Sequence, residues 1–245
     1  MAMKQLSAIF ITVLALYAMA GAAIWPNSPA NHGINTACTT GTSTCVVSLP
    51  LKVGAGDLLH FAIFLGTTAN ASCAGGTDAG CLIASITGDA GTFADLASSA
   101  GATAGNVNCG YILNAAGGEI SVTINTNFAI VGAWKASVID IPVSGSTFDV
   151  SANIVKTSST SQTGVALSPT SRADIIIRCT RGGATTIQLA TRGYTVADVN
   201  GGSSCWTLSN TFNGTAPTYT LSLATTMVEQ AEAFTAPLSP ASLIN

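Results

Sequence analysis

The amino-acid sequence predicts an all-β fold, a two-sheet antiparallel β-sandwich with the connections of a jelly roll. Three observations indicate it. Apolar and polar residues alternate with a period of two along most segments, and clusters rich in Gly, Asn and Asp separate these segments. After the N-terminal segment, no amphipathic helix pattern is sustained over three turns. We therefore expect about a dozen strands in one domain.

The N-terminal segment has the features of a secretory signal peptide. Lys4 precedes an apolar stretch over residues 6–16, and an A-x-A pattern follows at residues 18–20. We expect cleavage after Ala20. A retained transmembrane anchor is the alternative, because the apolar run approaches the length of a bilayer span. No later segment is apolar over that length, so we expect the mature chain to have no transmembrane span and to be secreted or held at the cell surface.

The predicted boundaries divide the chain into four parts. A signal peptide (1–20) and an N-terminal extension (21–43) precede the sandwich domain (44–236), and a C-terminal tail (237–245) follows it. Neither an internal repeat nor an interdomain linker interrupts the sandwich domain. The predicted domain is therefore single.

The apolar segments differ in how many faces they bury. In GEISVTINT, Ile120, Val122 and Ile124 alternate with polar residues, which is typical of a strand with one solvent-facing side. Continuous apolar runs predict central strands covered on both sides; these runs are LLHFAIFL, FAIVGAWKASVIDIP and DIIIRC. The last element, TTMVEQAEAF, is helical by propensity, but its place as the final alternating segment favours a closing strand.

The run GDLLHFAIFLG places one imidazole inside an apolar strand. His60 shares a strand face with Leu58, Ala62 and Phe64, and no second ligand or base lies two residues away from it. We therefore interpret His60 as a packing residue with one hydrogen bond, not as a catalytic or metal-binding group.

Composition and charge exclude one class of partner. The chain has 245 residues, of which 8% are charged, and a formal net charge of -3. Its eight basic residues are scattered and form no stripe that would neutralise a phosphate backbone. We therefore expect no nucleic-acid binding.

Seven cysteines follow the signal segment, and in an oxidising compartment their expected fate is disulfide formation. Sequence does not fix the connectivity, but local spacing ranks the pairs. The expected pairs are Cys38 with Cys45, Cys73 with Cys81, and Cys179 with Cys205. Cys109 is then the odd cysteine, a buried thiol. A zinc site is the alternative, but no C-x-x-C pair or nearby histidine supports it.

The order of these motifs resembles a recurrent β-sandwich module of secreted bacterial proteins. The matching pieces, within residues 50–236, are GDLLHFAIFLG, IASITGDAGTFADL, NCGYILNAAGGEISVTINT, KASVIDIPVSGSTFDVSA, RADIIIRCTRGG and MVEQAEAFTA. The resemblance implies a jelly-roll or concanavalin-like sandwich in an extracellular setting, and the module has no assigned activity. The chain departs from that pattern in its seven cysteines and at His60, where the pattern has an aliphatic residue, so no site residue carries over.

No catalytic constellation emerges from the sequence, and we expect no cofactor. The chain has no G-x-S-x-G elbow, no phosphate-loop fingerprint, and only two histidines, His32 and His60. A glycosidase needs two facing carboxylates, for which Glu229 and Asp140 are the best pair on predicted strands. The favoured interpretation of that pair is solvent-facing strand residues or polar groups at strand ends.

A calcium site is a weaker hypothesis. Asp78, Asp89 and Asp95 lie in Gly-rich turns, where carboxylates and loop carbonyls together can supply the oxygen ligands of Ca²⁺. Their spacing matches no known loop pattern. Turn chemistry explains the same residues without a metal, so we predict no metal site here.

We expect a non-enzymatic secreted module for binding or adhesion that recognises a glycan or another surface. Arg192, Tyr194 and Asp198, beside turn glycines, form the predicted binding patch, with Tyr194 as its surface-presented aromatic side chain. The alternative is a structural subunit of an extracellular filament, sheath or virion appendage, because low charge and Thr/Ala/Gly-rich strands suit self-assembly. A glycoside hydrolase on the same fold is the less favoured third hypothesis.

Overall fold

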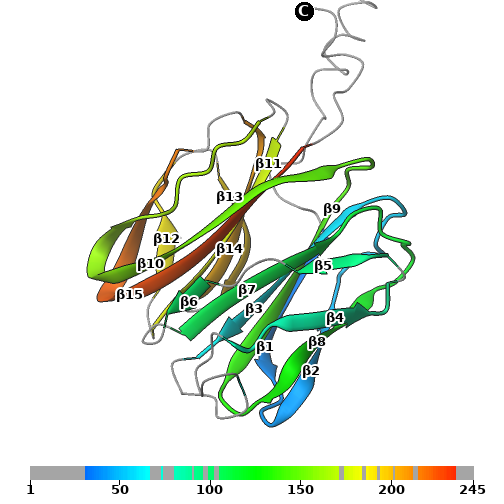
Figure 1. Cartoon of the computed structure of the whole chain (residues 1–245), viewed down its shortest axis with the longest axis horizontal. Helices are drawn as coiled ribbons and strands as arrows, with labels where there is room; N and C mark the ends of the chain where they lie inside the picture. Colours follow the sequence, from blue (N-terminus) through cyan, green and yellow to red (C-terminus); the bar gives the residue numbers. More distant parts are fainter. Residues whose placement is uncertain are drawn as a thin grey trace, which may run out of the picture. The chain divides into compact units, whose positions relative to one another are not determined.

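The period-two pattern of the sequence is realised as β-strands throughout the described part of the chain, which holds no α-helix (Figure 1). The computed structural model describes residues 31–66, 73, 80–89, 91–95, 99–101, 105–170, 174–183, 186–191, 194–200, 202–211 and 215–235. These residues belong to one compact unit, Asn27–Pro237. The all-β prediction is confirmed, but the described strands form three antiparallel sheets, not two.

Sheet A contains the strands with the most continuous apolar sequence. Its order is β1-β9-β3-β7-β5, with β6 also beside β7, and its strands are β1 (Asn31–Cys38), β9 (Trp134–Ile141), β3 (Leu58–Leu65), β7 (Gly105–Ile112), β5 (Phe93–Asp95) and β6 (Ser99–Gly101). All eight residues of β3 are buried, as predicted for a central strand covered on both sides. β1 lies in the predicted N-terminal extension, so the sheets begin before residue 44.

Sheet B is smaller than sheets A and C, and one of its faces is exposed to solvent. Its order is β2-β8-β4, with β2 (Thr42–Ser48), β8 (Ser121–Ile130) and β4 (Ile83–Thr87). Val122 and Ile124 of β8 join Phe61 and Ile63 of β3 in one hydrophobic core, so sheet B packs on sheet A. The alternation predicted for GEISVTINT is thus found, except that Ile120 precedes β8 and is 58% exposed.

Sheet C is formed by the C-terminal strands. Its order is β10-β15-β11-β14-β13, with β12 beside β15, and its strands are β10 (Thr147–Thr163), β15 (Thr218–Thr235), β11 (Asp174–Gly182), β14 (Ser203–Thr211), β13 (Thr195–Asn200) and β12 (Ile187–Leu189). The predicted closing strand is confirmed as part of β15. Sheet C packs on sheet A, since Tyr111 of β7 stacks on Phe148 of β10 and meets Phe234 of β15 edge to face.

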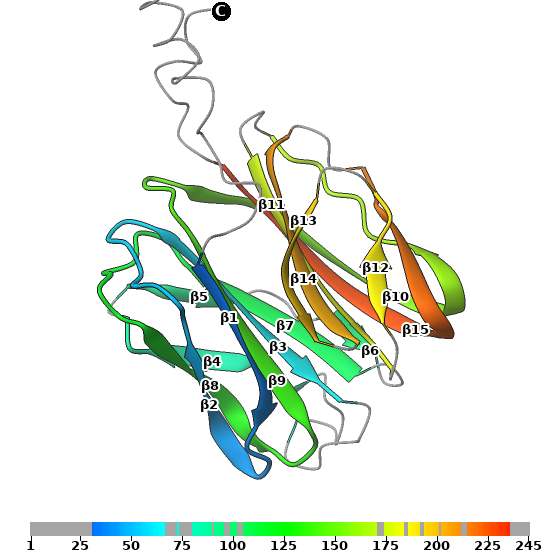
Figure 2. The same cartoon turned by 180° about the vertical axis from the view of Figure 1, so that it is seen from behind.

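Sheet A is therefore the middle of three layers, with sheets B and C on opposite sides (Figure 2). Alternate side chains of β3 divide between the two interfaces. Phe61 points toward sheet B, and His60 points toward sheet C, where its ring meets Phe234. Every polar group on β3 must therefore find its partner inside the protein.

Three disulfides have the predicted pairing: Cys38 with Cys45, Cys73 with Cys81, and Cys179 with Cys205. Cys109 is the seventh cysteine, and it is buried. Because disulfides persist where the surroundings are oxidising, they favour an extracellular or otherwise oxidising environment. Among the described residues, no helix has the length and hydropathy to cross a membrane.

The double burial of β3 predicts a large cost for truncating its core side chains. We expect Phe61→Ala to lower the free energy of unfolding by about 3–5 kcal/mol, because it leaves a cavity between sheets A and B. Leu223→Ala, at a position that is 63% exposed, is the control and should change stability by less than about 0.5 kcal/mol. Equilibrium denaturation with the disulfides intact measures both values, and equal effects would contradict the layer arrangement.

Candidate functional site

A buried histidine lies between sheets A and C. His60 of β3 stands opposite Tyr111 of β7 and Ile139 of β9. Its side chain is fully buried, and its Nε2 lies 3.2 Å from Oε2 of Glu232 on β15, which is also fully buried. The burial and the hydrogen bond agree with the sequence-based interpretation of His60. The partner, however, comes from another sheet.

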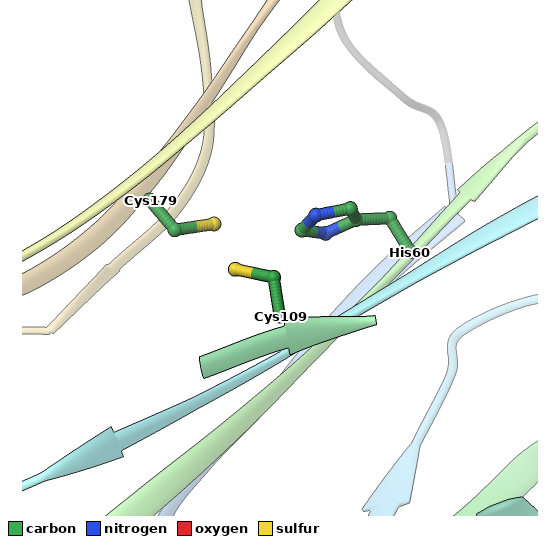
Figure 3. A group of neighbouring side chains, drawn as sticks. All are labelled: His60, Cys109 and Cys179. Atoms are coloured by element: carbon green, nitrogen blue, oxygen red, sulfur yellow. The ribbon is translucent and has the colours of Figure 1, made fainter. Parts of the chain in front are cut away.

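Two cysteines lie beside this histidine. Cys109 of β7, Cys179 of β11 and His60 each offer one donor atom, and the three atoms lie within 4.8 Å of one another. Figure 3 shows the two sulfur atoms and the imidazole ring directed toward one another. We call His60, Cys109, Cys179 and Glu232 the interlayer cluster. Spacing along the sequence places no histidine beside a cysteine pair, but the fold brings His60 to two cysteines because three strands from two sheets meet here.

The interlayer cluster does not complete a metal site while its disulfide is intact. Cys179 is bonded to Cys205, which lies opposite it on β14 with a Cα–Cα distance of 4.2 Å. A disulfide sulfur is a poor metal ligand, so of the three described residues whose donor atoms lie within reach of one ion, His60 and Cys109 remain. Zn²⁺ takes at least three protein ligands. The chemistry that the cluster does bring together is a thiol, an imidazole and a disulfide.

Four carboxyl groups gather where β3 and β8 begin and β4 and β9 end; we call Asp57, Asp89, Glu119 and Asp140 the carboxylate cluster. Asp140 is 3% exposed, and its Oδ2 accepts a hydrogen bond of 2.8 Å from Nδ2 of Asn31. Asp140 also interacts with Asp57, and Glu119 interacts with Asp89. Among the described residues, no three of these carboxyl groups lie within reach of one metal ion.

Asp89 is held by backbone amides. Its Oδ1 accepts a hydrogen bond from the amide of Gly91, and its Oδ2 accepts hydrogen bonds from the amides of Ala116 and Gly117. Gly117 has a φ of +80°, and a Cβ there would lie 2.6 Å from the backbone nitrogen of Ala55. Glycine is therefore required for the loop that binds Asp89 to pack so closely against the backbone of Gly54 and Ala55.

The surroundings push the pKa values of these acids apart. Burial, together with hydrogen bonding to Asp89, raises the pKa of Glu119 to about 7. Burial, together with the nearby charge of Asp57, raises the pKa of Asp140 to about 7. Burial would also raise the pKa of Asp89, but hydrogen bonds from Glu119 and from the backbone amides outweigh it and lower that pKa. Below pH 7, Glu119 thus mostly holds a proton that it donates to Asp89.

A second buried charge network lies on the face of sheet C turned away from sheet A. The guanidinium of Arg178 donates a hydrogen bond of 2.7 Å to Oε1 of Glu229, and the Tyr219 hydroxyl donates one of the same length. Oε2 of Glu229 accepts a hydrogen bond from the amide of Val165, and Arg178 Nε donates to the Tyr194 hydroxyl. Burial raises the pKa of Glu229 while Arg178 opposes that shift, so the ion pair depends on both partners.

The structure gives Tyr194 different surroundings from those predicted for a binding patch. Its ring is half-buried, and the Arg178 guanidinium carbon lies 5.6 Å from the ring centroid. Asp198 lies on β13, opposite Cys205. Arg192 lies outside the described residues. Tyr194 therefore supports the buried Arg178 instead of standing free at the surface.

The other candidate acids are also separated by the fold. Glu229 is bonded to Arg178 in sheet C, and Asp140 belongs to the carboxylate cluster at the end of sheet A, so the structure does not bring this pair together. Of the calcium candidates, Asp89 belongs to the carboxylate cluster and Asp95 ends β5. Asp78 lies outside the described residues.

Comparison with known proteins adds no further site. No protein-family model matches the sequence, and the search of curated proteins finds no match. The residues of the two clusters and of the Arg178 network are therefore interpreted from their own geometry.

The carboxylate cluster predicts that stability falls as the pH rises from 5 to 8. Below their ordinary pKa values of 4.5 and 3.8, Glu119 and Asp140 are protonated in both the folded and the unfolded chain. Between those values and about 7 the unfolded chain has released protons that the folded chain retains, so rising pH favours unfolding. Denaturation midpoints at pH 5 and pH 8 measure this slope. Glu119→Gln should flatten the slope and Ser121→Ala should not, and equal slopes would contradict the raised pKa values.

The Arg178 network predicts that removing one partner of the ion pair destabilises the protein far more than removing both partners. Arg178→Met should lower the free energy of unfolding by about 3–5 kcal/mol, because it leaves the Glu229 carboxylate buried without a cation. The double variant Arg178→Met/Glu229→Leu should recover most of that loss. Lys156→Met on β10 is the control and should change stability by less than about 0.5 kcal/mol. Equilibrium denaturation checks the series, and a double variant as unstable as Arg178→Met would contradict the interpretation.

Proposed function

We infer that this chain is an exported β-sandwich protein that binds a neutral, hydroxyl-rich surface such as a glycan. The observation that supports this inference is the solvent-facing side of sheet B. We call it the outer face of sheet B; its residues are Thr44, Val46 and Ser48 of β2, Ser121, Thr123 and Asn125 of β8, and Ser85 and Thr87 of β4. Each of them is partly or fully exposed.

The outer face of sheet B is polar without being charged. Seven of its eight side chains carry a hydroxyl or an amide group, and none carries a charge. They stand in rows across the strands, such as Thr44, Asn125 and Ser85. Neighbouring strands are about 4.8 Å apart and alternate residues along one strand about 6.8 Å apart, so donors and acceptors repeat at fixed spacings. Such an array suits a partner with repeating hydroxyl groups and no net charge.

Several ionisable side chains are buried and bonded to one another, which favours a binding role over a catalytic role. Arg178 and Glu229 are fully buried and bonded to each other, and His60 and Glu232 are likewise buried together. These four ionisable side chains thus stabilise the layers and do not line an open surface. A binding role needs no such charges, because hydroxyl and amide groups suffice for sugar recognition.

Export is the part of this proposal that the cysteines support. The three disulfides favour oxidising surroundings, and the N-terminal sequence has the pattern of a signal peptide.

We also propose that the sandwich follows jelly-roll connections. Binding through a sheet face is compatible with this topology, because the loops are not needed for the contact.

A glycan array with the full mature chain tests the binding role. We expect binding to one or more neutral polysaccharides, and we expect Thr123→Glu to reduce it at least tenfold, because a carboxylate at the centre of the outer face of sheet B has no partner there. Thr157→Glu, on an exposed position of β10 in sheet C, is the matched control and should bind like the wild type. No binding to any glycan, or equal loss in both variants, would contradict the proposed function.

Self-assembly is a second candidate, favoured by strand β10. This strand has 17 residues, lies at the edge of sheet C, and pairs with β15 alone among the described strands. A long edge strand is a template for pairing with another chain. Size-exclusion chromatography and negative-stain microscopy decide between the candidates: polymers of the mature chain would make a structural subunit the primary role.

A further inference from the structure

The interlayer cluster brings a thiol against a disulfide across the interface of sheets A and C. Sγ of Cys109 on β7 lies within 4.8 Å of Sγ of Cys179 on β11, and Cys179 is bonded to Cys205 (Figure 3). All three cysteines are 0% exposed. The disulfide is therefore an electrophile inside the protein, next to a potential nucleophile from another sheet.

His60 has the arrangement of a base for this thiol. One of its ring nitrogens lies within 4.8 Å of both sulfur atoms. Nε2 is 3.2 Å from the Glu232 carboxylate, and Nδ1 is buried without a hydrogen-bond partner among the described residues. When Nε2 carries the proton and donates it to Glu232, the lone pair is on Nδ1. A nucleophile, a base and a carboxylate that orients the base are the parts of an activated cysteine site.

We propose that the interlayer cluster is an internal thiol–disulfide exchange site, in which Cys109 attacks Cys179 and displaces Cys205. His60 removes the proton from the Cys109 thiol, and the thiolate attacks Sγ of Cys179. The Cys109–Cys179 bond forms as the Cys179–Cys205 bond breaks, and the electron pair leaves on Sγ of Cys205, which takes the proton from the imidazolium. One thiol and one disulfide are present before and after, so no oxidant or reductant is consumed.

The exchange moves a crosslink from within one sheet to between two. The Cys179–Cys205 disulfide joins adjacent strands of sheet C and has a sequence separation of 26 residues. A Cys109–Cys179 disulfide joins β7 of sheet A to β11 of sheet C and closes a longer loop, which constrains the unfolded chain more strongly. Cys38–Cys45 already ties sheet A to sheet B. The exchanged form therefore has covalent ties across both interfaces, a property separate from the proposed binding function.

The Cys205→Ser variant tests whether Cys109 and Cys179 bond to each other. The full chain is purified without reductant, incubated with glutathione disulfide at mildly alkaline pH, quenched in acid, alkylated and mapped by peptide mass spectrometry. We expect a Cys109–Cys179 peptide in most molecules, with a circular dichroism spectrum like that of the wild type. Recovery of both cysteines as thiols or glutathione adducts in the folded variant would overturn the proposal.

A matched control shows whether the pairing is specific. Cys45→Ser also releases one thiol, that of Cys38, at the other interface of sheet A. We expect Cys109 to form no bond with Cys38 under the same conditions. A Cys38–Cys109 peptide in that variant would mean that the thiols pair without regard to the native geometry, and it would overturn the proposal.

The wild-type chain tests the exchange and the role of His60. Incubation with N-ethylmaleimide captures the released thiol, so we expect molecules with alkylated Cys205 and a Cys109–Cys179 bond, which Cys109→Ser cannot form. His60→Gln should slow their appearance about 100-fold, whereas a purely structural role would change stability and not this rate. If His60→Gln does not fold, Glu232→Gln gives the same readout through the orientation of the ring. Alkylation confined to Cys109 at every time point would overturn the proposal.

Discussion

The burial of sheet A on both faces is the constraint on which the rest of the structure depends. Strand β3, in the middle of the three layers, exposes no side chain to water, so each polar atom on it costs free energy unless another element supplies a partner. For Nε2 of His60 on β3, that partner is Glu232, which lies 172 residues away in sequence and in another sheet. The register between the layers is thereby specified by a polar contact and not by apolar packing alone.

The same constraint explains why the charged groups are clustered. Asp140 and Asp57 lie where strands of sheet A end or begin, and the raised pKa of Asp140 lets it remain buried by keeping a proton. In sheet C, Arg178 and Glu229 remain buried and charged because they form an ion pair, with tyrosine hydroxyls hydrogen-bonded to both residues. These buried charges are therefore separate from the uncharged outer face of sheet B, on which the proposed binding function depends.

The sequence predicts the individual strands well, but it predicts poorly which strands share a sheet and which side chains meet between sheets. The apolar run around His60 identifies a doubly covered strand, and short spacing finds the Cys38–Cys45 disulfide, because both signals are local. The third sheet has no local signal, since a half-buried strand shows the same alternation whichever sheet it joins. The interlayer cluster depends on contacts between distant strands. One signal could have been used: a single Arg in the apolar run DIIIRC requires a buried counter-charge, and Glu229 lies in the closing strand.

The layers also follow the order in which the chain is made. The described strands of sheets A and B are complete at Ile141, where β9 ends, and every described strand of sheet C begins at Thr147 or later. During synthesis, the face of sheet A that carries His60 and Cys109 therefore emerges before the strands of sheet C that cover it. Until the last strand arrives, that face is an uncovered apolar surface with a thiol at its centre. Protection of this intermediate, by a chaperone or by rapid arrival of sheet C, thus becomes a requirement of biogenesis.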